Sequence, residues 1–192
     1  MRVRIRGSSG SAYVFVNKAD YDLRVPLTLK RAAEWSDPER GDVVVFFSPD
    51  TETRMVKRVI GLPGDTLELQ NNALIINGEP LQYGELAASQ RQGLAEQWQA
   101  RARFAEEELG GRKHAVMALE GVQNPKRSFA PIVIPEDSYF MMGDNRDNSL
   151  DSRFYGFVER EQIVGEAKRV LVSFDINNCL KPRLSRFGQA LR

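Results

Sequence analysis

Residues 139–158, YFMMGDNRDNSLDSRFYGFV, place acids, amides and arginines in close succession behind an apolar stretch and a glycine. The charged side chains of this segment that need partners are Asp144, Arg146, Asp147, Asp151 and Arg153. Charges removed from water must be paired and hydrogen-bonded, and the planar arginine fork suits carboxylates best. We therefore expect these residues to satisfy one another in one defined geometry that holds a further group in place. The alternative is a cluster of ordinary Asx turns.

Lys57 lies within an apolar run that ends in a Gly-Leu-Pro-Gly turn. Because alternate residues of a strand face opposite sides, Lys57 shares a face with Met55 and Val59. Val56 and Arg58 face the other side. Burial among apolar side chains lowers the pKa of an amine, which would suit Lys57 to act as a general base near neutral pH. The alternative is a lysine at a strand edge whose head group reaches water.

Three segments resemble sequence boxes of the bacterial type I signal peptidases: GDVVVF at 41–46, KRVIGLPGD at 57–65 and MGDNRDNSLDSRFYGFV at 142–158. Their order and approximate spacing are also similar, and the resemblance extends from about Tyr13 to the C-terminus. Members of that family are membrane-anchored endopeptidases that remove signal peptides after Ala-x-Ala. They use a serine nucleophile and a lysine general base, without a metal or other cofactor. The resemblance thus implies secretory preproteins as partners, recognised at the signal-peptide region before the cleavage site.

The resemblance also implies roles for individual residues. Lys57 falls on the catalytic lysine, and Ser149 falls on the serine whose hydroxyl orients that lysine. The positions that fall on the supporting ion pairs are Arg58, Asp144, Asp151 and Arg153, with Arg58 as a partner of Asp144. The positions expected to line the apolar surroundings of the lysine and to bind substrate are Met55, Val56 and Met141.

The nucleophile itself is unassigned. The family carries it in a Ser-Met-x-Pro-Thr-Leu-x-x-Gly-Asp motif just before YVFVNK, whereas residues 1–12 read MRVRIRGSSGSA. Counting back from Tyr13 places the nucleophile position on Val3. Nearby hydroxyl groups belong to Ser8, Ser9 and Ser11, of which Ser9 and Ser11 are the candidates, but GSSGSA is typical of a flexible linker. Much of the oxyanion hole would come from the same motif, so we expect this chain to be inactive as written.

Two other readings stay open beside an active peptidase domain. The first is a catalytically dead homologue that binds preprotein cleavage regions without cutting. The second is another serine/lysine protease, such as a self-cleaving repressor or a conjugation-pilin processing enzyme. It is disfavoured because the repressor group lacks a Gly-Asp-Asn-Arg-Asp-Asn-Ser box and because no DNA-binding segment precedes the strands. Truncation, engineering or decay would each explain the unusual N-terminus.

No stretch reaches the roughly 18 apolar residues that a spanning helix needs, and no secretory leader pattern opens the chain. The family places its catalytic domain on the periplasmic or extracellular side of the cytoplasmic membrane. We expect this chain to be soluble as written and to contact a membrane surface. The basic C-terminal segment CLKPRLSRFGQALR could rest on anionic lipid or pack on the core.

Composition excludes several other classes. The formal net charge of +1 gives no field for nucleic acid. One cysteine and one histidine allow no internal disulfide and nearly exclude a zinc site. We expect Cys179 to be a structural thiol and His114 to lie on the polar face of a strand.

The hydrophobic pattern predicts a mainly β fold. Strands are expected at 13–17, 43–47, 54–60, 66–69, 73–76, 132–134, 139–142 and 163–174. Asn-rich turns at 70–72 and Asn77-Gly78 would join some of them. Strands at this spacing predict an antiparallel, barrel-like or coiled β-sheet catalytic core.

The domain organisation follows from the breaks in this pattern. The core is expected to comprise residues 13–77 and 131–192, and residues 78–130 form a smaller inserted lobe. Residues 84–110 are rich in Ala, Gln, Glu and Arg, which predicts one helical segment in that lobe. Residues 1–12 are expected to be an atypical, linker-like N-terminus.

Overall fold

The computed structural model describes residues 2–7, 10–17, 20–24, 31–51, 53–86, 101–122, 124–175, 181–182 and 191. Within them, antiparallel strands dominate, and α2 (Ser152–Tyr155) is the only α-helix. Two 3₁₀ helices, η2 (Pro125–Arg127) and η3 (Arg160–Gln162), lie between strands. The mainly β, antiparallel fold predicted from the sequence is confirmed, and the sheets do not form a closed barrel.

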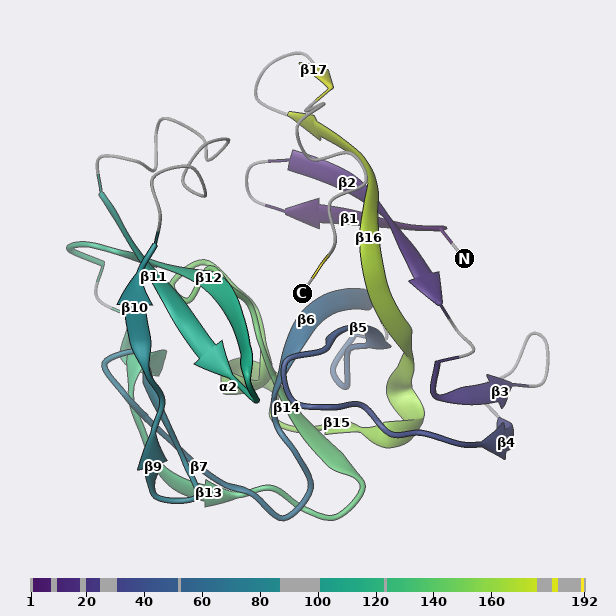
Figure 1. Ribbon diagram of the computed structural model, residues 1–192, viewed down its shortest axis with the longest axis horizontal. Coiled ribbons are helices and arrows are strands. Elements are labelled where there is room, and N and C mark those ends of the chain that lie inside the picture. The colour runs from purple at the N-terminus through teal and green to yellow at the C-terminus, as the bar shows by residue number, and fades with distance from the viewer. Residues whose placement is uncertain are drawn as a thin grey trace.

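The largest sheet has the strand order β1-β2-β16-β5-β6-β14-β15, with β17 beside β16 (Figure 1). Its strands are β1 (Arg2–Gly7), β2 (Gly10–Asn17), β5 (Val43–Phe47), β6 (Arg54–Gly61), β14 (Ser138–Met142), β15 (Val158–Glu159), β16 (Ile163–Asp175) and β17 (Lys181–Pro182). The lysine strand β6 lies between β5 and β14, and Val44 is the β5 residue opposite Lys57. Neighbours on both sides therefore fix the register of Lys57.

The described residues also form three smaller sheets. One has the order β13-β7-β8-β9, a second the order β10-β11-β12, and the third pairs β3 with β4. Their strands are β3 (Asp22–Arg24), β4 (Arg31–Glu34), β7 (Thr66–Gln70), β8 (Ala73–Ile76), β9 (Glu79–Pro80), β10 (Tyr83–Glu85), β11 (Ala102–Leu109), β12 (Arg112–Leu119) and β13 (Phe129–Val133). In Figure 1 the β7–β13 and β10–β12 sheets lie on the opposite side of β14 from β2 and β16.

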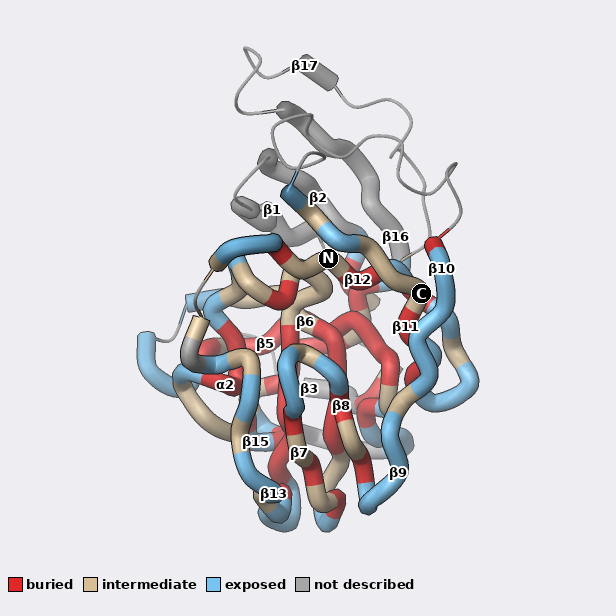
Figure 2. Tube along the Cα trace, turned by 90° about the vertical axis from the view of Figure 1, so that its left-hand side faces the viewer, coloured by how far each residue is buried: buried red, intermediate tan, exposed pale blue. Residues whose placement is uncertain are grey.

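The alternation of β6 divides its side chains between separate apolar clusters. Met55 and Val59 pack in a cluster with Val44, whereas Val56 packs against a second cluster built around Val45. A third cluster contains Ile60 and fills the space toward β7 and β8. Figure 2 shows buried residues along β5, β6 and β8. The predicted facing of Met55 and Val59 away from Val56 is confirmed.

The Asn-rich hairpin turn is also confirmed. Asn71 and Asn72 join β7 to β8 and have φ values of 50° and 69°. A two-residue hairpin turn with positive φ at both positions matches the twist of the flanking strands, and asparagine tolerates this conformation best among residues with a side chain. Asn77 and Gly78 repeat the arrangement between β8 and β9.

The predicted helix at 84–110 is wrong where the structure describes it. Residues 83–85 form β10, residues 102–109 form β11, and residues 87–100 lie outside the described residues. Strand β11 pairs with β12 along its whole length through a turn at Gly110-Gly111. Helix propensity is a weak preference that strand pairing overrides, here with β12 after the two-residue turn and with the earlier strand β10.

Where the structure describes residues 1–12, at 2–7 and 10–12, they differ from the linker-like segment expected. Arg2–Gly7 form β1, and Gly10 begins β2, which pairs with both β1 and β16. Arginine alternates with Val3 and Ile5 in this segment, and such alternation favours a strand over a linker.

Candidate active site

Lys57 and Ser149 are in contact in the folded protein. Lys57 lies on β6, and Ser149 lies in the loop that follows β14, 92 residues later in the chain. The Lys57 Nζ donates a hydrogen bond of 2.7 Å to Ser149 Oγ. Both residues are half-buried. The structure thus brings together the two residues that the resemblance assigned to the catalytic pair.

Burial lowers the pKa of Lys57 below its usual value, because the ammonium form loses hydration. The nearby charges partly cancel one another: Arg153 lowers this pKa further, while the carboxylates of Asp151 and Asp144 raise it. A lowered pKa places more neutral amine at neutral pH. The environment therefore favours the form of lysine that can accept a proton.

Because Gly143 has no side chain, it provides the space in which the side chains of Lys57 and Ser149 meet. A Cβ atom at residue 143 would lie 2.2 Å from Ser149 Oγ and 3.5 Å from Lys57 Nζ. The first distance is too short for any contact between unbonded heavy atoms. Glycine at this position is therefore a packing requirement of the pair.

We expect Gly143→Ala to separate the pair and to destabilise the fold by about 1–3 kcal/mol, the usual range for overpacking. A crystal structure of the variant should show the Nζ–Oγ distance beyond hydrogen-bonding range, and urea denaturation gives the stability. Gly84→Ala is the matched control, because its Cβ would meet nothing closer than 4.0 Å. An unchanged distance between Lys57 and Ser149 in Gly143→Ala would show that the pair does not depend on this glycine.

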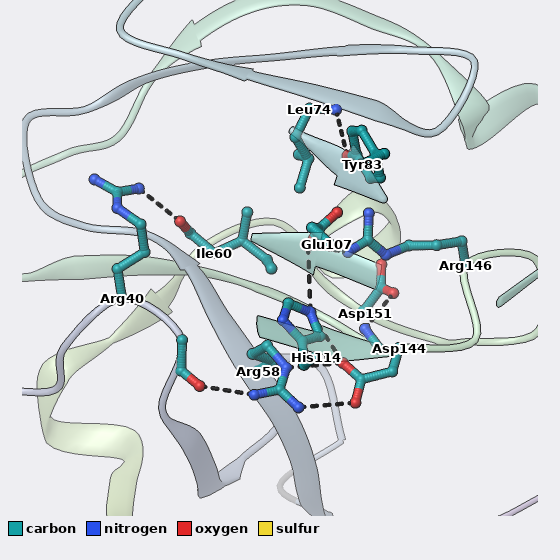
Figure 3. Close-up of polar contacts among 12 residues, drawn as sticks. Arg40, Arg58, Ile60, Leu74, Tyr83, Glu107, His114, Asp144, Arg146 and Asp151 are labelled. Carbon is teal, nitrogen blue, oxygen red and sulfur yellow. Dashed lines mark hydrogen bonds and ion pairs between the residues drawn. The ribbon is translucent and has the colours of Figure 1, made fainter. Parts of the chain in front are cut away.

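Arg58 connects the lysine strand to the loop of Ser149. Its Nε and Nη2 donate to the two carboxylate oxygens of Asp144 at 2.9 and 3.0 Å, and its Nη1 donates to the Gly41 carbonyl at 2.8 Å (Figure 3). Burial alone would raise the pKa of Asp144, but the charge and hydrogen bonds of Arg58 lower it. Asp144 therefore stays ionised and holds Arg58, the neighbour of Lys57, in one orientation.

Asp151 and Arg153 form the second expected pair. Arg153 Nε and Nη2 each donate to Asp151 at 2.8 Å, and neither side chain is exposed to solvent. The same carboxylate accepts from the Gly143 backbone at 3.1 Å and caps helix α2 by accepting from the Arg153 backbone. Asp151 thereby connects α2 to the glycine beside Ser149.

The five charged residues of the 139–158 segment do not all pair with one another, as the sequence suggested. Asp151 and Arg153 do, but Asp144 pairs with Arg58, and Asp147 pairs with Arg127 and also accepts from the Leu119 backbone. The remaining member, Arg146, donates to Glu107 of β11 at 2.6 Å. These partners lie far away in the sequence, so spacing within the segment could not identify them.

Sequence reasoning gave Glu107 no role at the site and placed His114 on a polar strand face. Both are buried, Glu107 completely, and they lie opposite each other on β11 and β12. The expectation for His114 is wrong because this face of the hairpin packs against the loop of Asp144. Strand alternation in 102–109 would have given the signal, had that segment not been assigned to a helix.

The other predicted residues have the following places. Met141 is buried and Met55 half-buried in the cluster that contains Val59, and Val56 is half-buried on the opposite face. Ser11 lies in β2, where its backbone is described and its side chain is not, while Ser8, Ser9 and Cys179 lie outside the described residues. In the part of the chain that the structure describes, no group of three or more His, Cys, Asp or Glu side chains could hold a metal ion.

Comparison with known proteins identifies the family to which this chain belongs. Residues 9–172 match the family described as signal peptidase, peptidase S26. Signal peptidase I of Pseudomonas fluorescens is 37% identical over 186 residues, which cover 90% of this chain and 61% of that protein. Signal peptidase I S of Bacillus subtilis (strain 168) is 36% identical over 152 residues, which cover 79% of this chain and 67% of that protein.

This chain therefore belongs to the signal peptidase family of S26 peptidases. A crystal structure of a signal peptidase I from Enterococcus faecalis V583 is 30% identical, covers 68% of this chain and 97% of that chain, and has a TM-score of 0.42. The chain spans 63% of the length of signal peptidase I from Buchnera aphidicola of Schizaphis graminum, to which it is 30% identical. Among the described residues, no helix combines the length and the apolar character needed to cross a bilayer.

Proposed function

We propose that this chain supplies the lysine side of a serine/lysine endopeptidase site that cleaves signal peptides after Ala-x-Ala. The observation that carries the proposal is the 2.7 Å hydrogen bond from Lys57 Nζ to Ser149 Oγ in a half-buried setting. Lys57 is the general base, and Ser149 orients it. Family membership supports secretory preproteins as the kind of substrate.

The hydrogen bond explains how Ser149 would direct the base. A neutral amine has two N–H donors and one lone pair. When one N–H donates to Ser149 Oγ, the lone pair is turned away from that oxygen and toward the space where a nucleophilic hydroxyl would lie. Lys57 then accepts the proton of that hydroxyl as its oxygen attacks the scissile carbonyl carbon. The resulting ammonium returns the proton to the departing amine.

The apolar side chains around this pair fit a substrate with small residues. Met55, on β6, and Met141, on β14, belong to the cluster that contains Val59, whereas Val56 lies on the other face of β6. We propose that Met55 and Val56, which are half-buried, contact the residues on either side of the cleavage point, and that Met141, which is buried, packs in the same cluster as Met55. Apolar contacts at the site would also limit hydration of Lys57 when substrate is bound and so keep its pKa low.

The nucleophile would come from a Ser-Met-x-Pro-Thr-Leu-x-x-Gly-Asp motif ahead of Tyr13, which residues 3–12 do not contain. The chain as printed would then bind a preprotein cleavage region without cutting it. A homologue that only binds is the second candidate, and the sequence of residues 3–12 is the observation that favours it. We further propose that the working enzyme acts at the outer surface of the cytoplasmic membrane, in keeping with its family.

The test compares the chain as printed with a chain in which that ten-residue motif replaces residues 3–12. Both are incubated with a preprotein, and products are analysed by mass spectrometry. We expect no cleavage by the first chain and cleavage after Ala-x-Ala by the second, because only the second has a nucleophile and the donors that stabilise the oxyanion. The rebuilt chain with alanine in place of the motif's serine is the matched control.

Two results would contradict the proposal. Cleavage after Ala-x-Ala by the chain as printed would show that another residue is the nucleophile. A rebuilt chain that folds, binds the preprotein and still does not cut would favour the binding-only homologue. Binding is measured separately by titrating each chain with a peptide that spans the cleavage region.

A further inference from the structure

The β11–β12 hairpin of the inserted lobe contacts the loop that carries Ser149. The Met117 backbone donates to the Asp144 carbonyl at 2.9 Å, and the Arg146 backbone donates to the Met117 carbonyl at 2.8 Å. These two bonds form a parallel bridge between Met117 and Asn145. The loop that positions Ser149 is thus attached to the lobe as well as to β14.

A buried ion pair strengthens this attachment. Glu107 Oε1 accepts from Arg146 Nη2 at 2.6 Å, and the two side chains are 0% and 2% exposed. His114 Nε2 lies 3.3 Å from the same Glu107 oxygen and 3.9 Å from Asp144 Oδ1. Figure 3 shows Glu107, His114 and Arg146 gathered beside Asp144 and Arg58. The group therefore extends from the lobe to the residue next to Lys57.

The charges in this group depend on one another. Burial alone would raise the pKa of Glu107, but the adjacent His114 and Arg146 lower it to about 2. Among the described residues, Nε and Nη1 of Arg146 have no hydrogen-bond partner, so Glu107 is the hydrogen-bonded carboxylate that compensates its charge. Such pairs add little stability over apolar side chains of similar size, and their best-supported use is to select one arrangement.

We propose that Glu107 is a positioning residue for the Lys57–Ser149 pair. It holds Arg146, whose backbone is bonded to β12, and so fixes the loop of residues 143–149 in the conformation that places Ser149 against the lysine. Removing this support lets the loop move and water enter, so that the amine is better hydrated. The inference rests on the proposed function, since it concerns the same pair.

The test follows the titration of Lys57 in the 192-residue chain by NMR of ¹³C-labelled lysine, with Lys57→Arg to assign the signal. The main variant is Glu107→Leu combined with Arg146→Met, which removes both charges and leaves neither partner unpaired. Glu106→Gln is the matched control, because Glu106 is the preceding residue on β11 and pairs with the exposed Lys113 instead. Dispersed amide spectra verify that each variant is folded.

We expect Lys57 to titrate below the other lysines in the parent and in Glu106→Gln. In the double variant the pKa of Lys57 should rise by about one pH unit, which corresponds to a tenfold decrease in the neutral amine at neutral pH. Ser149→Ala should shift the pKa of Lys57 when it is introduced into the parent. The same change should add little in the double variant, because the contact between Lys57 and Ser149 is already lost there. If the double variant does not fold, Glu107→Gln, which keeps the side-chain shape, replaces it in the same comparison.

The outcomes separate the two proposals. Two results would overturn the role of Glu107 and leave the proposed function standing. In the first, the pKa of Lys57 is low in the parent and stays unchanged in the folded double variant. In the second, Ser149→Ala shifts the pKa of Lys57 in the double variant as much as it does in the parent. A parent in which Lys57 titrates together with the surface lysines would refute the proposed function and this inference with it.

Discussion

Lys57→Met in the chain rebuilt with the nucleophile motif is expected to reduce kcat by about 10⁴-fold, the upper end for loss of a general base. Methionine keeps the length and the apolar contacts of the lysine stem but has no basic lone pair. Proton transfer from the nucleophile then has no acceptor, whereas substrate binding should change little. Measurement of kcat and KM on a preprotein substrate tests both expectations.

The matched control for this change is Lys113→Met. Lys113 lies on β12 with its side chain 62% exposed and forms an ion pair with Glu106. Its replacement should leave kcat unchanged, because an exposed pair contributes little. Retention of kcat within tenfold by the Lys57→Met enzyme would remove Lys57 from the mechanism.

Lys57→Met should also change the pH dependence of protein stability. Burial lowers the pKa of Lys57 in the folded protein, so the unfolded chain binds more protons between the folded pKa and the usual lysine value. The free energy of unfolding should therefore rise with pH across that window, and Lys57→Met should remove this contribution to the slope. Urea denaturation at several pH values measures the slope of the free energy of unfolding against pH for the parent and for Lys57→Met.

Asp151→Asn is expected to lower the free energy of unfolding by about 3–5 kcal/mol. The change leaves the guanidinium of Arg153 buried without an opposing charge, since both side chains are 0% exposed and bonded to each other. It also weakens the bond from the Gly143 backbone and the cap of helix α2. Urea denaturation of the chain as printed measures the loss.

Two comparisons identify the cause of that loss. Glu120→Gln removes one partner of the exposed Arg103–Glu120 pair and should cost at most about 1 kcal/mol. Asp151→Leu combined with Arg153→Met removes both buried charges and should recover much of the stability. If Asp151→Asn were no more destabilising than Glu120→Gln, Asp151 would not be the support that the geometry indicates.

Features that depend on neighbouring residues could be predicted from the sequence. The strands at 43–47 and 73–76 have the bounds expected, because continuous or alternating apolar residues between turn residues specify them locally. The facing of Val56 and the positive φ of Asn71 follow from the same local rules. The meeting of Lys57 with Ser149 was expected because both lie in segments that resemble one family.

Features that depend on distant partners could not be predicted in this way. Residues 102–109 contain good helix formers, yet they form a strand that pairs with β10, which lies before residues 87–100 in the sequence, as well as with the following strand β12. Arg146 and Asp147 are adjacent to acids and arginines in the sequence, yet their partners are Glu107 and Arg127. Which of several nearby charges forms a pair is decided by the fold, and the sequence offers no rule for choosing among them.

The most direct test of Lys57 as the general base compares two titrations in the rebuilt chain. The first is the NMR titration of the Lys57 amine, and the second is the pH dependence of kcat/KM for preprotein cleavage on its acid side. Because only the neutral amine accepts a proton, the cleavage rate should rise with pH and reach half its maximum at the pKa of Lys57, below that of the surface lysines. A rate that is already maximal while Lys57 is still protonated would contradict this account.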